Sequence, residues 1–350
     1  MKVRFAVNIS SGSIFPRRSD RQKFAELIRV IDGAGVDMIS TYDSSFLGGD
    51  AYVRATLIAE HAENAMIGVH PTNPLTREPQ IMGGFLGSLD ALTEGRAFVG
   101  IGSGDSAVYN IGYKPATRAR IESYVACMRG LWEKGEAIYD GRLHQARWGG
   151  ALDRRKIPVM LLCAEGPRMF HLAGRISDGV LSGAGVLPEV IENTRNLVRE
   201  GALAEGRDPE EIPFWFTTRT SLDEDREKAQ RAIYDSVASI LNHSMRFGLE
   251  NKSLPTQLVA KVQEFIDGYA LYEHQVQHGT NGKRMVDIGL ADYAMDRYAI
   301  AGTVGDWIDR IDELADAGAT NLYISVERGD LDRQINYMRV FAEEIRPRFL

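Results

Sequence analysis

The most specific candidate for ligand chemistry is a short turn at residues 164–168. Its sequence is Ala164-Glu165-Gly166-Pro167-Arg168, and it joins an apolar run to an amphipathic one. A proline suits the first position of a helix, and the free N–H groups of a helix N-terminus attract phosphate. Gly166 would let the backbone approach such a ligand, and Arg168 could add positive charge. We therefore predict a phosphate-binding turn here, with a simple turn and a solvent-facing arginine as the alternative.

Glycine and polar residues also follow other apolar runs. The string at 102–106, Gly-Ser-Gly-Asp-Ser, could be a turn with a helix N-cap or part of a ligand site. The residues assigned to the candidate site in this way are Asn8, Asp43, Thr72, Asn73, Gly102, Ser103, Asp105, Gly183, Ala184 and Gly185. A second set of glycines is predicted to end helices, namely Gly35, Gly95, Gly174, Gly206 and Gly318. The first set would let a flat, phosphorylated ligand lie close to the backbone.

Among the histidines, His70 is the candidate general acid or base. It directly follows an apolar run, and an unperturbed imidazole has a pKa of about 6.5, which lets it work near neutrality. His274 and His278 are four residues apart on a predicted helix, which is the spacing of a metal pair. No third ligand is evident, so we favour a solvated helix face for this pair and predict no metal site.

Eight apolar runs are predicted to be strands, and most alternate with amphipathic, helical stretches. They lie at 3–9, 36–41, 65–69, 96–102, 157–164, 178–183, 213–219 and 321–326. Alternating strands and helices indicate a parallel sheet, and eight such units indicate a closed (β/α)8 TIM barrel, whose active site lies at the carboxyl ends of the strands. An open doubly wound sheet, which normally has five or six strands, is the alternative.

The regular alternation is interrupted at 220–300, a stretch that should hold only one connection between strands. This segment is predicted to be mostly helical, with a polar loop at 277–285, and to form a lid, part of the pocket or a dimer surface. A shorter polar stretch, 135–156, is predicted to be a surface hairpin or loop. We interpret residues 1–350 as a single barrel domain that carries the 220–300 insertion.

The composition excludes several classes of protein. The chain has 350 residues, a net charge of −7 and two cysteines, which argue against a disulfide framework, intrinsic disorder and nucleic-acid binding. No apolar run approaches the roughly 18 residues of a membrane span, and the first residues resemble a strand more than a signal peptide, so we expect a cytoplasmic protein. The sequence contains no H-E-x-x-H, no G-x-S-x-G after a strand and no G-x-G-x-x-G. A bulky cofactor that carries the chemistry itself is the remaining expectation.

The chain resembles the luciferase-like superfamily of flavin- and deazaflavin-dependent oxidoreductases. Within it, the likeness is to the branch that contains methylenetetrahydromethanopterin reductase. The matching strings lie at 67–77, 89–96, 100–107, 166–180 and 301–303. Their order and spacing together are specific, although no single string is. Residues 220–300 show no clear likeness.

The resemblance implies a βα barrel, usually dimeric, with a flavin ring on the rim and its phosphate near 164–168 and 183–185. Family members often have a non-prolyl cis peptide at the end of the third strand, which here would fall within Gly68-Val69-His70. Thr72 and Asn73 would then lie beside the polar edge of the ring. The resemblance also places Asp43 and Asp105 near the ring.

Two departures from the family pattern affect the expected activity. Members that oxidise alcohols or sugars with a deazaflavin carry an Asp-His pair after the second strand, where this chain has Asp43-Ser44. His70 and Pro71 replace small residues that are usual in the reductase branch. The first departure argues against alcohol or sugar oxidation. The second argues against assigning the methanopterin substrate of that branch to this chain.

The main hypothesis is therefore an FMN-dependent monooxygenase, which would use reduced FMN from a separate flavin reductase, with oxygen, on a small organic substrate. His70 would be its acid or base, and Asp43 and Asp105 would orient His70 or the ring. One alternative is a hydride transferase that uses the deazaflavin coenzyme F420 in the same pocket. Another is a flavin-binding protein without catalysis. We expect substrate specificity to come from 220–300 and from the loops 10–18 and 44–50.

Overall fold

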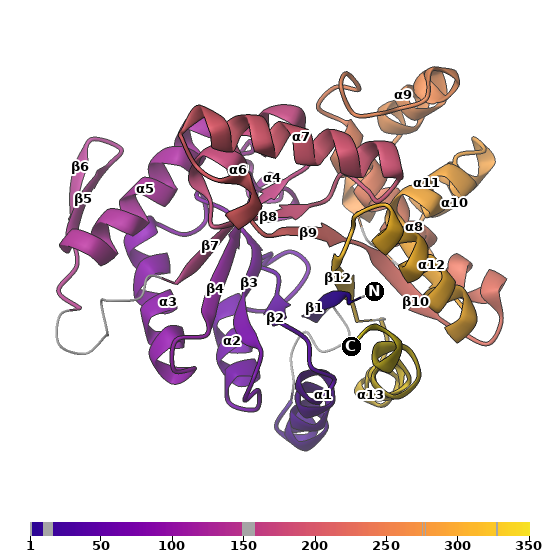
Figure 1. Ribbon diagram of the computed structural model, residues 1–350, viewed down its shortest axis with the longest axis horizontal. Helices are drawn as coiled ribbons and strands as arrows, with labels where there is room; N and C mark the ends of the chain where they lie inside the picture. The colour runs from indigo at the N-terminus through magenta and orange to yellow at the C-terminus, as the bar shows by residue number, and fades with distance from the viewer. Residues whose placement is uncertain (1, 10–16, 149–157, 275, 277, 327) are drawn as a thin grey trace.

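The apolar runs of the sequence form a closed barrel of parallel strands (Figure 1). The structure, a computed structural model, describes residues 2–9, 17–148, 158–274, 276, 278–326 and 328–350. Around the barrel the strands follow the order β1, β12, β9, β8, β7, β4, β3, β2. They are β1 (Arg4–Ile9), β2 (Met38–Thr41), β3 (Met66–Thr72), β4 (Ala97–Ile101), β7 (Val159–Ala164), β8 (Gly179–Ser182), β9 (Phe214–Thr217) and β12 (Asn321–Ser325). The predicted TIM barrel is confirmed, and the open doubly wound sheet is wrong.

Helices connect the strands and cover the outside of the barrel (Figure 1). They are α1 (Arg21–Gly33), α2 (Ala51–Ala59), α3 (Pro79–Leu92), the short α4 (Ser106–Tyr109), α5 (Arg118–Lys134), α6 (Pro167–Ile176), α7 (Pro188–Ala204), α12 (Val304–Asp316) and α13 (Leu331–Val340). Several begin at a side-chain cap, as where Thr303 and Asp306 form a reciprocal capping box at the start of α12. None of the helices in the described ranges combines the length and the apolar character that a membrane span requires.

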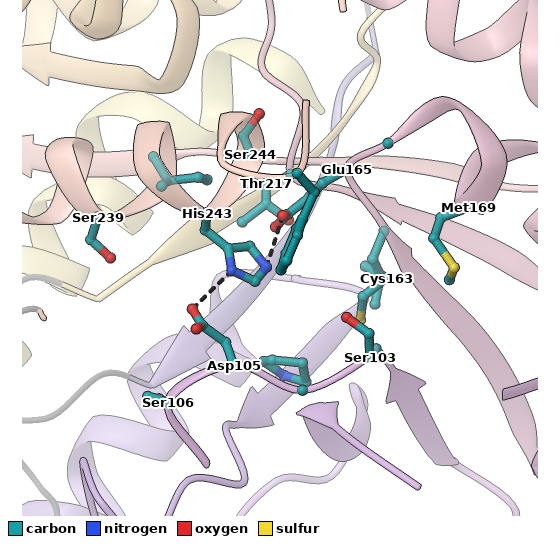
Figure 2. Close-up of a pocket in the computed structure, with 18 of the residues that line it drawn as sticks. Ser103, Asp105, Ser106, Cys163, Glu165, Met169, Thr217, Ser239, His243 and Ser244 are labelled. Atoms are coloured by element: carbon teal, nitrogen blue, oxygen red, sulfur yellow. Dashed lines mark ion pairs between the residues drawn. The ribbon is translucent and has the colours of Figure 1, made fainter. Parts of the chain in front are cut away.

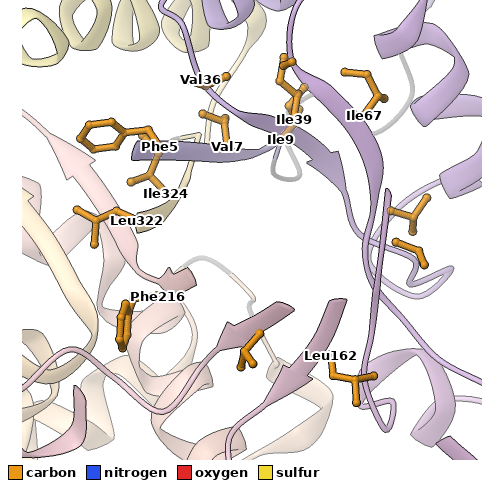
Figure 3. Close-up of a cluster of buried hydrophobic side chains, with 14 of the residues drawn as sticks. Phe5, Val7, Ile9, Val36, Ile39, Ile67, Leu162, Phe216, Leu322 and Ile324 are labelled. Carbon is orange, nitrogen blue, oxygen red and sulfur yellow. The ribbon is translucent and has the colours of Figure 1, made fainter. Parts of the chain in front are cut away.

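Alternation along the strands divides the core into two layers. In β1, Phe5, Val7 and Ile9 point outward and pack against the helices (Figure 3). Ala6 points the other way and belongs to a separate cluster inside the barrel, which also contains Tyr323 of β12. Because successive side chains of a strand face opposite sides, the wall of the barrel buries apolar groups on both. A rigid frame of this kind fixes the positions of the strand ends.

The segment between the seventh and eighth barrel strands carries its own small core. It begins with β10 (Arg219–Leu222) and ends with β11 (Ala299–Gly302), which pair in parallel with each other. The helices between them are α8 (Arg226–Met245), α9 (Val259–Asp267), α10 (Thr280–Asp287) and α11 (Ala291–Tyr298). Their apolar faces form a cluster that is distinct from the barrel core.

The predicted polar loop at 277–285 is wrong, because α10 begins at Thr280. Asn281 is buried, and its side chain bonds both the N–H and the carbonyl of Ala270. A Cβ on Gly282 would lie 2.7 Å from an oxygen of Asp235 in α8, so the glycine allows the two helices to pack closely. Long-range contacts therefore turn a polar, glycine-containing sequence into a helix. Residues 275 and 277 lie outside the described ranges.

A two-stranded hairpin of β5 (Glu136–Tyr139) and β6 (Arg142–Gln145) projects beyond the barrel (Figure 1). Asp140 and Gly141 at its tip both have positive φ, of 52° and 71°, as a tight hairpin turn requires. The segment 135–156 was predicted to be a surface hairpin or a loop, and its first part is a hairpin. Residues 149–157 lie outside the described ranges.

The prediction that Gly174 ends its helix is wrong. Gly174 lies inside α6, where α7 packs against it. A Cβ on Gly174 would lie 2.1 Å from the carbonyl oxygen of Val198. By contrast, Gly35, Gly95, Gly206 and Gly318 have positive φ, in agreement with their predicted place at helix ends. The close approach of α6 and α7 supports the turn at 164–168 from behind, because α6 follows that turn directly.

We predict that Gly174→Ala lowers the free energy of unfolding by about 1–3 kcal/mol, because the added methyl group collides with backbone that cannot move away. The control is Gly33→Ala at the end of α1, where an added Cβ meets nothing within 4 Å. That change should be neutral or stabilising, by up to about 1 kcal/mol. Urea-unfolding midpoints measure both effects. Equal midpoints for the two variants would contradict the close packing inferred at Gly174.

Candidate active site

A cavity of about 900 Å³ opens at the end of the barrel where the strands have their carboxyl ends. This volume is within the range of sites that enclose a small molecule or cofactor. Every barrel strand contributes a lining residue at or just beyond its carboxyl end: Asn8, Tyr42, Thr72, Gly102, Cys163, Gly183, Thr217 and Ser325. The segment after β10 adds further lining residues, among them Ser239, His243, Ser244, Lys252 and His274.

The structure brings most of the sequence-predicted site residues to this cavity. Those that line it are Asn8, Asp43, His70, Thr72, Asn73, Gly102, Ser103, Asp105, Glu165, Gly166, Pro167, Arg168 and Gly183. Five others are not lining residues: Gly68, Val69, Ala164, Ala184 and Gly185. Their surroundings explain this. A Cβ on Gly68 would collide with Phe98, Gly185 packs against Arg297, and the other three belong to the buried core.

At the base of the cavity, His70 lies above the barrel interior. Its ring is 4.7 Å from that of Tyr323, and its Nδ1 shares a 3.3 Å hydrogen bond with Cys163 Sγ. Burial, and then the charge of Arg219, lowers the pKa of His70 to about 3. The imidazole is therefore neutral at pH 7, and the premise that it titrates near neutrality is wrong. Sequence alone does not show burial, and burial decides this pKa.

The cis peptide that was expected within Gly68-Val69-His70 is also misplaced. In the structure the cis bond joins His70 to Pro71, so it is a prolyl bond one step further along the chain. A tertiary amide adopts the cis form far more readily than the secondary amide of the family pattern. Asn8 Nδ2 donates to the carbonyl of His70 at 2.8 Å and so fixes the backbone next to this bond.

Asp43 and Asn73 are held by neighbours at the edge of the cavity. The carboxylate of Asp43 faces the guanidinium of Arg77 at 3.2 Å and accepts a 2.8 Å hydrogen bond from Thr72. Asn73 Oδ1 accepts from the N–H groups of Leu75 and Thr76, so its side chain forms a turn. Asp43 therefore holds Thr72 in place, which is consistent with an orienting role. Its catalytic role stays a prediction.

An ion-pair network in the cavity wall joins α8 to two strand ends, as Figure 2 shows. His243 lies between two carboxylates, with Nδ1 2.8 Å from Asp105 Oδ2 and Nε2 2.8 Å from Glu165 Oε2. Arg246 donates to the other oxygen of Asp105 at 2.7 Å. Because Asp105 follows β4 and Glu165 follows β7, one imidazole bridges separate parts of the rim.

The two carboxylates keep His243 protonated. Burial alone would lower the pKa of His243, but the charges of Glu165 and Asp105 outweigh burial and raise it to about 10. Burial alone would raise the pKa of Asp105, yet His243 and Arg246 hold it well below its usual range. A protonated imidazole donates from both nitrogens, which matches the contacts observed. The site therefore holds a proton on His243, between Asp105 and Glu165.

Gly166 forms an open cradle beside this network. It is the N-cap of α6, with Pro167 as the first helical residue and no side chain capping the helix. Its φ of −115° suits any residue, and a Cβ there would meet nothing within 4 Å, so the space beside it belongs to the cavity. This geometry fits the phosphate end of a cofactor, because a helix N-terminus favours an anion and a bare backbone lets it approach.

Sequence reasoning missed His243, Arg246, Arg219 and Lys252, which all lie in or beside the insertion. Ser239 and His243 are four residues apart in α8, among residues that are otherwise largely buried and apolar. Polar residues at i and i+4 on an apolar face were the available signal for a pocket.

The expected solvated face for His274 and His278 is wrong for the first of them. His274 is buried, and its Nδ1 shares a 2.9 Å hydrogen bond with the hydroxyl of Tyr269. Its Nε2 is 3.7 Å from Asp105, so it belongs to the network of the cavity wall. His278 is exposed and has a positive φ of 59°, so the two rings do not share a helix face. In the described ranges, no group of three potential ligands could hold a metal ion.

We predict that His243→Gln destabilises the protein by about 3 kcal/mol at pH 6.5, because Glu165 loses its buried partner. The folded-state pKa of His243 is raised, so its contribution is full below the unfolded pKa of about 6.5 and is lost as pH rises towards about 10. Urea unfolding of both proteins between pH 6 and pH 10 should show the difference shrinking. His278→Gln at the exposed site is the control. A pH-independent difference would contradict a protonated His243.

Most of the chain is similar to proteins of known families. Residues 3–321 match the profile of a protein family described as luciferase-like monooxygenase. The chain is 30% identical over 306 residues to 5,10-methylenetetrahydromethanopterin reductase of Methanolobus tindarius, covering 86% of this chain and 89% of that protein. It is 24% identical over 298 residues to an F420-dependent glucose-6-phosphate dehydrogenase of Beutenbergia cavernae, covering 83% and 80%.

A solved structure has the same fold over the full length. It is the coenzyme F420 dependent tetrahydromethanopterin reductase of Methanopyrus kandleri, with a TM-score of 0.77, 24% identity and complete coverage of both chains. The cavity described above therefore lies in a barrel whose architecture is shared throughout with this reductase.

Proposed function

We propose that this chain, which belongs to the luciferase-like monooxygenase family, is a reductase or dehydrogenase that uses the deazaflavin coenzyme F420. The observation that carries this proposal is the likeness, at 30% identity over most of both chains, to a methylenetetrahydromethanopterin reductase. Two further similar proteins are described as F420-dependent. The hypothesis of an FMN monooxygenase rested on two departures from the family pattern, at Asp43-Ser44 and at His70-Pro71. The likeness to F420-dependent proteins outweighs those departures, so we now prefer the alternative.

The residues of the cavity fit a phosphorylated, flat cofactor. Gly166, Pro167 and Arg168 would hold its phosphate end at the start of α6, since this helix end is uncapped and open to the cavity. Gly183, where a Cβ would lie 2.6 Å from Glu165 Oε1, leaves the adjoining wall free of side chain. When bound, coenzyme F420 supplies hydride transfer to or from a carbon atom of the substrate.

The chain itself would supply the proton that accompanies hydride transfer. Asp105 and Glu165 both line the cavity, and His243 lies 2.8 Å from each. The proton would start on His243, pass along one of these short hydrogen bonds to a carboxylate, and go from that carboxylate to a substrate atom. His243 would then be left neutral and would regain a proton from solvent. His70, neutral at pH 7, would orient bound groups by hydrogen bonding. The buried wall formed by α8 would limit the access of water to these groups.

The choice between the two cofactors makes a direct prediction. We expect oxidised F420 to bind with a dissociation constant at least about tenfold lower than that of FMN, oxidised or reduced, in fluorescence titrations with and without a reducing system. The bound deazaflavin should then be reduced or oxidised by a suitable substrate under anaerobic conditions. Tight binding of reduced FMN, with oxygen-dependent turnover, would restore the monooxygenase hypothesis. Tight flavin binding without any turnover would favour a non-catalytic flavin-binding protein.

The cradle at Gly166 predicts a graded loss of affinity. A side chain at this position fills space in the cavity without straining the backbone, so Gly166→Ala should weaken F420 binding moderately and Gly166→Val by about tenfold or more. Thermal unfolding of the ligand-free variants should remain close to that of the parent protein, because nothing lies within 4 Å of the added Cβ. Unchanged affinity in both variants would place the phosphate elsewhere.

A further inference from the structure

Arg219 is a cation of the cavity that forms no ion pair with any residue that the structure describes. Arg219 is the first residue of β10, two positions beyond the end of β9, and it lines the cavity. Among the residues that the structure describes, it takes part in no ion pair, and its enclosed Nε has no hydrogen-bond partner. Burial and the charge of Arg328 lower the pKa of Arg219 only to about 10, so the guanidinium stays charged at neutral pH.

Three acids that line the cavity are already engaged by other cations. Asp43 is held by Arg77, and Asp105 is held by His243 and Arg246. Glu165 accepts from the same imidazolium. None of the three is within ion-pair distance of Arg219, so its charge is compensated only over longer range.

A second unsatisfied group adjoins the arginine. Thr218, the preceding residue, is fully buried and lines the cavity, and within the described part of the chain its Oγ1 has no hydrogen-bond partner. Buried polar groups are nearly always paired, so an unpaired hydroxyl next to a guanidinium without an ion pair, both in the cavity wall, is consistent with a ligand that supplies a partner. A ligand that pairs with the guanidinium would carry an anionic acceptor.

Arg219 belongs to a different element of the fold from the proposed phosphate cradle. Its charge acts on His70 at the base of the cavity and on His274, and the charge of Glu165 acts on Arg219 in turn. The cradle, in contrast, is built from Gly166 and the start of α6. An anion at Arg219 would lie in the same cavity as His70, on the side formed by the start of β10.

We propose that Arg219, with Thr218 beside it, binds a carboxylate of the substrate, so that the protein acts on a small organic acid. This inference rests on the proposed function and specifies its substrate class. A guanidinium is planar and offers two parallel N–H donors to the two oxygens of a carboxylate, which anchors one end of the molecule in a defined orientation. The other end can then face the cofactor and the network around His243.

An unpaired, enclosed charge also has a cost in the ligand-free protein, since desolvation is not offset by a partner. Removing it should therefore stabilise the empty protein while abolishing carboxylate binding. A merely structural arginine would show the opposite, because its removal would break contacts. Arg77, which is paired with Asp43 and Asp50, is the matched structural case.

The test uses benzoate and benzamide as probes of nearly the same shape, the second lacking the charge. Isothermal titration of the cofactor-free protein should show benzoate binding at least about tenfold more tightly than benzamide. Arg219→Met should abolish this preference and raise Tm by about 1–3 °C, whereas Arg77→Met should lower Tm. Equal binding of the two probes, or an unchanged preference in Arg219→Met, would overturn the proposal.

A second pair of measurements distinguishes a substrate site at Arg219 from a cofactor site. Arg168→Met at the cradle should weaken F420 binding and leave benzoate binding unchanged, whereas Arg219→Met should do the reverse. Loss of F420 affinity in Arg219→Met would show that Arg219 serves the cofactor and would refute a substrate carboxylate. If no variant and not even the parent protein binds F420, the proposed function fails. The benzoate result, obtained without cofactor, still decides the role of Arg219.

Discussion

The imidazolium of His243 links the two parts from which the cavity is built. The barrel supplies Asp105 and Glu165 from separate strand ends, and α8 supplies the ring between them. Two carboxylates this close to one another would repel if nothing stood between them, and an unpaired imidazolium inside the wall would lose its solvation. Each charge is thus tolerated because of the others. This arrangement sets the protonation state of the site and joins α8 to the wall of the cavity.

The barrel could be predicted from the sequence because its signal is local. Runs such as 3–9 and 321–326 are apolar on both faces, and alternation with helices leaves few arrangements for them. The strand ends then indicate a site, and residues as far apart as Asp43 and Glu165 are gathered by topology alone. Nothing more than spacing and residue type was needed for that step.

The insertion could not be predicted in the same way. Its contribution to the site rests on contacts between distant positions, such as Arg246 with Asp105, which are 141 residues apart. Helical periodicity describes the face of a helix but not its partner. Burial is a long-range property too, which is why an ordinary pKa was expected for His70 and a solvated face for His274. Gly174 shows the same limit, since the sequence predicted it to end a helix, whereas it lies inside α6 against the backbone of α7.

The pairing of β10 with β11 has a consequence for how such a protein could change over evolutionary time. Arg219 lies opposite Ala299 and Leu222 opposite Gly302, so the chain leaves the barrel and returns to it at neighbouring points. The residues between form a core of their own. A unit with adjacent ends can be lengthened, shortened or exchanged without altering the register of the strands beneath it. Selection could therefore remodel which molecules are accepted at the mouth of the barrel while the barrel strands remain unchanged.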